Sequence, residues 1–157
     1  LPTFAQAAKS AGVDGVVIPD LPAEEAGGMR LAIGGAGLDL GYLAAPTSTA
    51  ARLKAIAKAA TGFIYVVSVA GVTGERKGFD ERLASTVQEL RRYSKVPLAI
   101  GFGISSPESA QEAARLADGV VVASTVLKAV LDAPDEAAGL ILAEERTALL
   151  ASATRGR

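Results

Sequence analysis

The chain contains no cysteine and no histidine. Disulfides, thiol nucleophiles and Cys/His zinc sites are therefore excluded, and so is any Ser-His-Asp triad, because it needs an imidazole. Acid–base chemistry is left to carboxylates, lysine or tyrosine. A strong net charge is also missing, since 16 basic side chains stand against 17 acidic ones. This balance provides no electrostatic footprint for nucleic acid or for an acidic membrane, so neither partner is expected.

Long apolar runs are absent as well. No run reaches the roughly 18 residues that span a bilayer, and the first 11 residues lack the layout of a signal peptide. We therefore expect a cytoplasmic protein. What the sequence does have is 157 residues, half of them hydrophobic, which is typical of a globular domain. A single domain over residues 1–157 is the prediction.

Short apolar runs alternate with longer stretches of helical spacing, which is typical of β/α units with a parallel sheet. We expect strands at 15–19, 38–44, 63–68, 97–101 and 119–123. Helices are expected at 22–32, 49–60, 79–93, 106–116, 124–131 and 135–153. Two helices carry core-facing stripes at i, i+3, i+4 spacing, formed by Leu53, Ile56 and Ala57 and by Leu83, Val87 and Leu90.

The start of the helix at 106–116 has the clearest local signal. The sequence S-S-P-E at 105–108 offers a serine N-cap, a proline in the first turn and the S-x-x-E spacing of a capping box.

Five consecutive right-handed β/α units form either a curved partial barrel or an open doubly wound sheet, and the apolar pattern leaves both possible. A dinucleotide-binding sheet would carry G-x-G-x-x-G after an early strand. The first strand runs instead into P-D-L-P at 19–22, which makes that alternative weaker.

The last two strands end in residues suited to an anion. Gly101 and Gly103 allow backbone amides to approach a ligand, and Ala123 and Ser124 open a short helix whose N-terminus attracts phosphate. In β/α barrels, phosphate is commonly held after the seventh and eighth strands. The alternative is that the two glycines only make a tight turn.

The loop at 69–78 has three glycines and a polar tip, which favours a mobile lid over the site. Within it, Thr73 is the side chain suited to hold a catalytic carboxylate. An ordinary flexible connection is the alternative.

Three further residues lie at strand ends. Asp20 is either a working carboxylate or a helix N-cap, and we favour the N-cap. Tyr65 and Phe102 are candidates for the apolar walls of a pocket, although core filling is the better explanation for any lone aromatic.

Three segments resemble the tryptophan synthase alpha subunit in order and spacing. They are D-G-V-V-I-P-D-L-P-A-E-E at 14–25, Y-V-V-S-V-A-G-V-T-G at 65–74 and G-F-G-I-S-S-P-E at 101–108. The resemblance covers nearly the whole chain. It implies an α/β fold of the (β/α)8 TIM barrel family, here a partial barrel of about five parallel strands with flanking helices, lacking the first three β/α units.

The resemblance also implies the roles of single residues. The substrate pocket would include Tyr65, Phe102 and Val17, and Asp20 would stand behind it at the end of barrel strand 4. The lid would be Gly71, Val72, Thr73 and Gly74, with Thr73 touching the catalytic aspartate. Phosphate would be bound by Gly74, Gly101, Gly103, Ala123 and Ser124, where the family usually has glycine in place of Ala123.

The implied function is tryptophan biosynthesis, as a lyase that cleaves indole-3-glycerol phosphate to indole and glyceraldehyde 3-phosphate. No cofactor or metal is expected in the chain, and the implied partner is the beta subunit of a heterotetramer. The family's acid–base glutamate and aspartate lie upstream of the matched segments, so no catalytic residue is assigned here and activity of the chain alone is not expected. Two alternatives remain, namely another phosphate-binding barrel enzyme and a catalytically silent fragment that only binds ligand or partner.

Overall fold

The computed structural model describes residues 1–68 and 81–155, in which helices and strands alternate. The strands are β1 (Gly15–Val17), β2 (Asp39–Ala44), β3 (Ile64–Val67), β4 (Leu98–Gly101) and β5 (Gly119–Val121). The helices are α1 (Pro2–Ser10), α2 (Gly27–Gly35), α3 (Ala50–Ala59), α4 (Glu81–Tyr93), α5 (Pro107–Leu116), α6 (Ser124–Leu131) and α7 (Glu136–Thr154). All five expected strands are therefore confirmed, with ends shifted by at most two residues.

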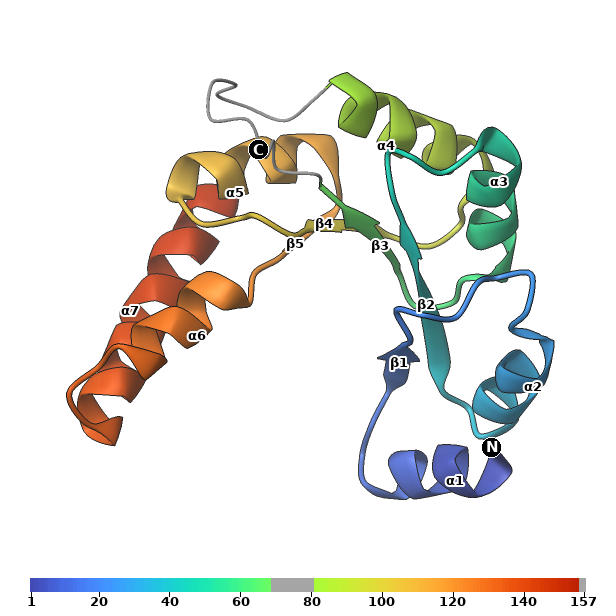
Figure 1. The fold of residues 1–157 in the computed structure, drawn as a ribbon, viewed down its shortest axis with the longest axis horizontal. Helices are drawn as coiled ribbons and strands as arrows, with labels where there is room; N and C mark the ends of the chain where they lie inside the picture. Colours follow the sequence, from blue (N-terminus) through green and yellow to red (C-terminus); the bar gives the residue numbers. More distant parts are fainter. Residues whose placement is uncertain (69–80, 156–157) are drawn as a thin grey trace.

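The five strands form one parallel sheet in the order β1-β2-β3-β4-β5. Each strand pairs with the next one in sequence, so the order never reverses. A doubly wound sheet has such a reversal and is therefore excluded. Figure 1 shows the result, an arch in which α3, α4 and α5 lie on the convex side, with α1 and α2 at one end and α6 and α7 at the other. The architecture is an open half-barrel.

The two faces of the sheet have different surroundings. Strand register and period-two alternation place one set of side chains under the helices, where they are buried, namely Leu40, Tyr42, Ala44, Ile64, Val66, Leu98 and Ile100. The opposite set lies on the concave face, namely Val17, Gly41, Leu43, Tyr65, Val67, Ala99, Gly101 and Val121. Most of this second set is only half-buried. The core thus lies between the sheet and the helices, and the concave face is open.

The predicted helix stripes meet this core. Leu53, Ile56 and Ala57 of α3 and Leu83, Val87 and Leu90 of α4 are all buried. Short polar side chains form the N-caps of α3 and α7. The Thr49 hydroxyl accepts a hydrogen bond from the Arg52 amide, and the Asp135 carboxylate accepts one from the Ala138 amide.

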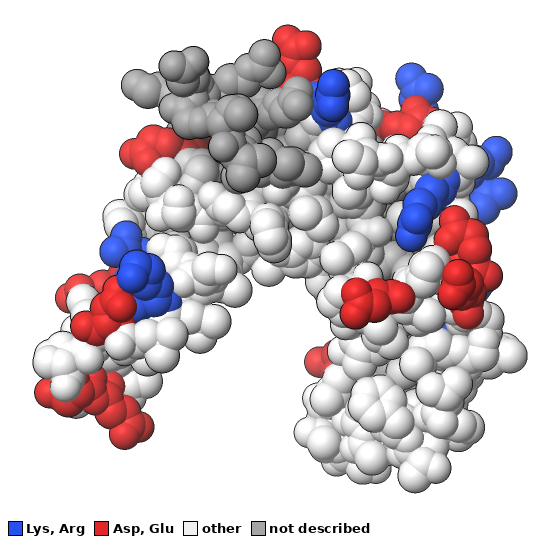
Figure 2. Space-filling model, in the orientation of Figure 1, with Lys and Arg blue, Asp and Glu red and all other residues white. Residues whose placement is uncertain are grey.

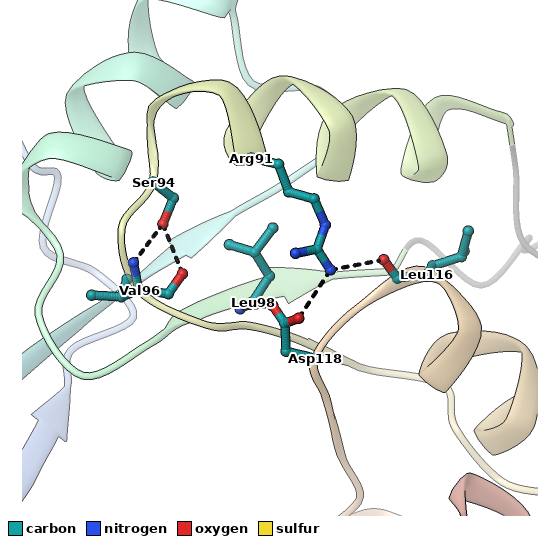
Figure 3. Close-up of polar contacts among 6 residues, drawn as sticks. All are labelled: Arg91, Ser94, Val96, Leu98, Leu116 and Asp118. Atoms are coloured by element: carbon teal, nitrogen blue, oxygen red, sulfur yellow. Dashed lines mark hydrogen bonds and ion pairs between the residues drawn. The ribbon is translucent and has the colours of Figure 1, made fainter. Parts of the chain in front are cut away.

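A polar cluster fastens the starts of the last two strands (Figure 3). The Asp118 carboxylate accepts from the Leu98 amide at 2.9 Å and from the Arg91 guanidinium at 3.1 Å. The same guanidinium donates to the Leu116 carbonyl at the end of α5. One carboxylate thereby ties β4, α4 and the α5–β5 connection together, which holds β4 and β5 in register.

Two sequence predictions at helix starts were wrong. Helix α2 begins at Gly27 with Ala26 as N-cap, five residues later than expected, because 22–25 forms a turn closed by the Glu25 amide and the Pro22 carbonyl. Asp20 is therefore not its N-cap.

At α5 the capping box exists, but its members are Ser106 and Ser109. Proline occupies the first helical position, so the residue just before it is the N-cap and Ser109, not Glu108, stands at the third position.

In the described part of the chain, none of the helices combines the length and the apolar character that crossing a bilayer requires.

Candidate functional site

A cavity of about 480 Å³ lies at the C-terminal ends of β3, β4 and β5. This volume is in the range of small-molecule sites. Its lining residues come from the end of each of these strands and from the start of α6, namely Tyr65, Phe102, Gly103, Ile104, Ser105, Val121, Ala123, Ser124, Thr125 and Lys128. Five of the residues singled out from the sequence are thus brought together at one edge of the sheet.

Gly101 has a steric role beneath this cavity. A Cβ built at Gly101 would collide with the hydroxyl end of the Tyr65 ring, so only glycine lets Tyr65 lie across the neighbouring strand. Burial raises the pKa of the Tyr65 phenol, and a hydrogen bond with the Phe102 backbone opposes the rise. Tyr65 therefore presents a neutral aromatic wall whose hydroxyl sits against the turn after β4.

The turn after β4 has an unusual backbone. Phe102 has a φ of 77° and Gly103 a φ of 75°, both in the left-handed region. For a phenylalanine this conformation costs of order 1–3 kcal/mol and persists only where the surroundings hold it. Phe102 is 68% exposed, so it is not a core residue, and it lines the cavity.

Ser68 is a functional candidate that the sequence reasoning missed. It directly follows β3, is 1% exposed, and its hydroxyl donates to the carbonyls of both Gly101 and Phe102. Its amide also donates to the Gly101 carbonyl at 2.9 Å. The available signal was a single serine at the end of an otherwise apolar strand, which is weak without knowing which strand lies beside it.

The start of α6 forms the opposite wall. Ala123 is the N-cap and makes no side-chain cap, while Ser124 and Thr125 are the first helical residues and line the cavity. The first amides of a helix have no intrahelical acceptor and lie at the positive end of its dipole, which favours an anion.

Lys128 is the only charged side chain among the lining residues that the structure describes. Its ammonium donates to the Asp132 carboxylate at 2.6 Å on the exposed side of α6. It therefore adds positive charge near the cavity, partly offset by Asp132.

The remaining predicted site residues lie elsewhere. Gly71, Val72, Thr73 and Gly74, the expected lid, fall outside the described residues. Val17 lies on the concave face of β1, at the far end of the sheet from β5, and does not line the cavity. Asp20 is exposed in the turn after β1. Neither Val17 nor Asp20 is among the residues that line the cavity.

The described residues hold no cluster of three or more acidic side chains placed to bind a metal ion. Chemically, the arrangement consists of an aromatic wall, amide groups that have no partner among the described residues, and a helix N-terminus, all around a cavity that would accept a small phosphorylated ligand.

Comparisons with known proteins give a consistent result. A family model described as tryptophan synthase alpha chain matches residues 1–154. The alpha chain of Citrifermentans bemidjiense is 50% identical over 125 residues, covering 80% of this chain and 47% of the relative. That of Novosphingobium aromaticivorans is 42% identical over 150 residues, covering 96% and 56%. The chain thus spans about half the length of these relatives.

Solved structures agree with the sequence matches. A structure of tryptophan synthase from Mycobacterium tuberculosis matches with a TM-score of 0.84 at 34% identity, covering 98% of this chain and 56% of the other. One of the tryptophan synthase a2b2 complex from Pyrococcus furiosus matches with a TM-score of 0.83 at 32% identity, covering 96% and 60%. The half-barrel therefore corresponds to part of a TIM barrel, as the sequence resemblance implied.

Proposed function

Since the chain belongs to the tryptophan synthase alpha chain family, we propose that it serves tryptophan biosynthesis by cleaving indole-3-glycerol phosphate to indole and glyceraldehyde 3-phosphate. The observation that carries this proposal is the cavity at the ends of β3, β4 and β5. It joins an aromatic wall from Tyr65 to a backbone turn and a helix N-terminus suited to a phosphate group.

In this proposal the chain provides the phosphate-binding half of the active site. Phosphate is bound by the amide of Gly103 and by those of Ala123 and Ser124 at the start of α6. Gly101 and the lid residue Gly74 also belong to this phosphate site. Tyr65 and Phe102 flank the indole ring, and Val17, which does not line the cavity, is assigned to the pocket that a closed barrel would form. Asp20 stands behind these groups, and the lid of Gly71–Gly74 excludes water with Thr73 directed at a carboxylate.

The proton transfers need carboxylates that this cavity does not contain among the described residues, since Lys128 is its one charged side chain. We assign them to the part of the relatives' length that the chain does not match. Protonation of the indole ring and removal of a glycerol hydroxyl proton would then break the carbon–carbon bond. Binding energy from the remote phosphate orients the substrate for that step.

The proposed partner is a tryptophan synthase beta subunit. The Pyrococcus furiosus relative is described as an a2b2 complex, and the likeness to it extends over 96% of this chain. We propose the same assembly and a cytoplasmic location for this protein. No cofactor is assigned to the chain itself.

Isothermal titration calorimetry of the 157-residue chain with glycerol 3-phosphate tests the binding half of the proposal. We expect saturable binding, and no binding of uncharged glycerol, because the dianion supplies most of the attraction to the helix N-terminus. Equal binding heats for glycerol 3-phosphate and glycerol would contradict the proposed phosphate site.

The catalytic half is tested by adding a polypeptide that carries the first three β/α units of a relative. Indole release that requires both polypeptides supports the division of roles. If the pair forms a stable complex that binds substrate but releases no indole, the chain is a catalytically silent binder.

A further inference from the structure

The buried hydroxyl of Ser68 contacts the turn after β4 on the side of β3. The side chain of Ser68 is 1% exposed and contacts two successive carbonyl groups, those of Gly101 and Phe102. One hydroxyl proton is thus shared between two peptides of the neighbouring strand end. Because a serine hydroxyl has only one donor proton, contact with two carbonyl groups constrains two peptide planes at once.

The orientation of these carbonyls determines where the next amide points. In a trans peptide the C=O and the following N–H point in opposite directions, and the described chain contains no cis peptide. Because the Phe102 carbonyl is directed at Ser68, the Gly103 N–H is directed away from it. Strand β4 lies between β3, which Ser68 directly follows, and β5, which leads to α6. The Gly103 amide therefore faces the side on which Ala123 and Ser124 line the cavity.

The left-handed backbone at Phe102 needs such support. A non-glycine residue with a φ of 77° is held against its intrinsic preference, and the hydrogen bonds of Ser68 and Tyr65 with the Phe102 backbone oppose its relaxation. The Gly103 amide has no hydrogen-bond partner among the described residues. Oriented amides of this kind form anion-binding concavities.

We propose that Ser68 is a positioning residue for phosphate binding, which holds the Phe102–Gly103 peptide so that the Gly103 amide faces the ligand. This inference rests on the proposed function of the cavity and adds a residue that touches no substrate. The hydroxyl acts by restricting the turn to one orientation before the ligand arrives, so that no affinity is lost to reorganisation.

The test compares variants of the 157-residue chain by calorimetry with glycerol 3-phosphate. We expect Ser68→Ala to raise the Kd about tenfold, corresponding to one lost hydrogen bond. Ser68→Thr keeps the donor and is expected to stay within about threefold of the parent chain, since only a methyl group is added.

Thr86→Val is the matched control. Thr86 is also a buried hydroxyl, 6% exposed, which donates to the Arg82 carbonyl within α4 and away from the cavity. Thr86→Val should lower the melting temperature about as much as Ser68→Ala does, but it should leave the Kd for glycerol 3-phosphate unchanged. This separates positioning of the turn from general loss of stability.

Each outcome is informative. If the parent chain binds and Ser68→Ala binds equally well, or if Thr86→Val weakens binding as much, the positioning role is overturned while the proposed function stands. Absence of binding by the parent chain overturns both. Should Ser68→Ala fail to fold, Ser68→Cys, which has nearly the same volume and a weak donor, takes its place with the same expected rise in Kd.

Discussion

At the scale of single residues, the geometry of the site depends on glycines and on an unusual backbone turn more than on polar side chains. Gly101 leaves room for the Tyr65 ring, and the turn at Phe102 and Gly103 adopts a backbone that most residues avoid. Ala123 carries a methyl group where the family usually has glycine, yet its backbone still forms the N-cap of α6. The chemistry of the cavity is therefore largely that of the main chain.

The backbone at Gly103 allows a charge test with little change in shape. Asp and Asn are nearly isosteric, and both tolerate a positive φ better than other residues. We expect Gly103→Asp to lower affinity for glycerol 3-phosphate at least about a hundredfold, since a like charge in contact with a ligand costs several kcal/mol. Gly103→Asn should lose much less affinity. Equal calorimetric affinities for the two variants would show that no anion is bound beside this residue.

Tyr42 presents a different situation within the core. Its side chain is 2% exposed, and its hydroxyl has no hydrogen-bond partner among the described residues. An unsatisfied buried hydroxyl costs about 1–3 kcal/mol. Tyr42→Phe should therefore leave the free energy of unfolding unchanged or raise it by about 1 kcal/mol in urea denaturation at pH 7. A clear loss of stability would indicate that the hydroxyl has a partner, and Tyr93→Phe on α4 serves as the exposed control.

The same residue predicts a pH dependence. Burial raises the pKa of the Tyr42 phenol above its ordinary value of 10.0, against the opposing charge of Arg30. Because the folded-state pKa is the higher one, the stabilising contribution is complete below pH 10 and is lost as the pH rises through the folded value. The parent chain should consequently lose more stability than Tyr42→Phe between pH 9 and about pH 11. Parallel curves of unfolding free energy against pH would contradict this.

At the scale of elements, the helix starts set the geometry of the loops at the cavity. Ser106 caps α5 and exchanges hydrogen bonds with Ser109, which fixes where the chain leaves the turn after β4. The Ser106 side chain also lowers the pKa of the exposed Glu108 carboxyl. The orientation of α5 is thus coupled to the residues that line the cavity.

A cap deletion tests this coupling. Ser106→Ala should lower the free energy of unfolding by about 1 kcal/mol, the usual value of an N-cap serine. Ser105→Ala, which removes the neighbouring exposed hydroxyl, should change it by less than about 0.5 kcal/mol. Chemical denaturation of the two variants decides between the observed cap and the pairing of Ser105 with Glu108 that the S-x-x-E spacing had indicated. A larger loss of stability for Ser105→Ala than for Ser106→Ala would favour the pairing of Ser105 with Glu108.

At the scale of the whole molecule, the half-barrel leaves two strand edges and one sheet face without protein against them in the described part of the chain. Figure 2 shows a hollow under the arch, with few charged side chains on its visible walls. Large apolar side chains are also exposed on the helices at both ends of the arch, including Leu1, Phe4, Leu31, Leu127, Leu131, Leu140, Ile141 and Leu149. Exposed strand edges beside apolar patches favour association with other chains.

We therefore expect the 157-residue chain, produced alone, to self-associate in analytical ultracentrifugation. Val17→Lys places a charge on the concave face at the β1 edge, outside the cavity, and should reduce the associated fraction. A monomer with a sharp, cooperative thermal transition would contradict the prediction. Addition of a polypeptide that carries the first three β/α units of a relative should suppress self-association, because eight strands close a barrel and remove both edges.

The sequence by itself determined the succession of β/α units, the core stripes of α3 and α4, and the glycine and helix-start motifs of the cavity. These are local properties, since hydrophobic periodicity and capping depend on residues a few positions apart. It failed at Asp20 and at the start of α2, where a turn at 22–25 competes with helix over the same short polar segment.

Only the tertiary structure decided that the sheet is an open arch and that Ser68 contacts the turn after β4, 33 and 34 residues away in sequence. Both depend on which strand lies beside which. The hydrogen bonds that set this order join residues far apart in the chain, so no local pattern of apolar and polar residues encodes them.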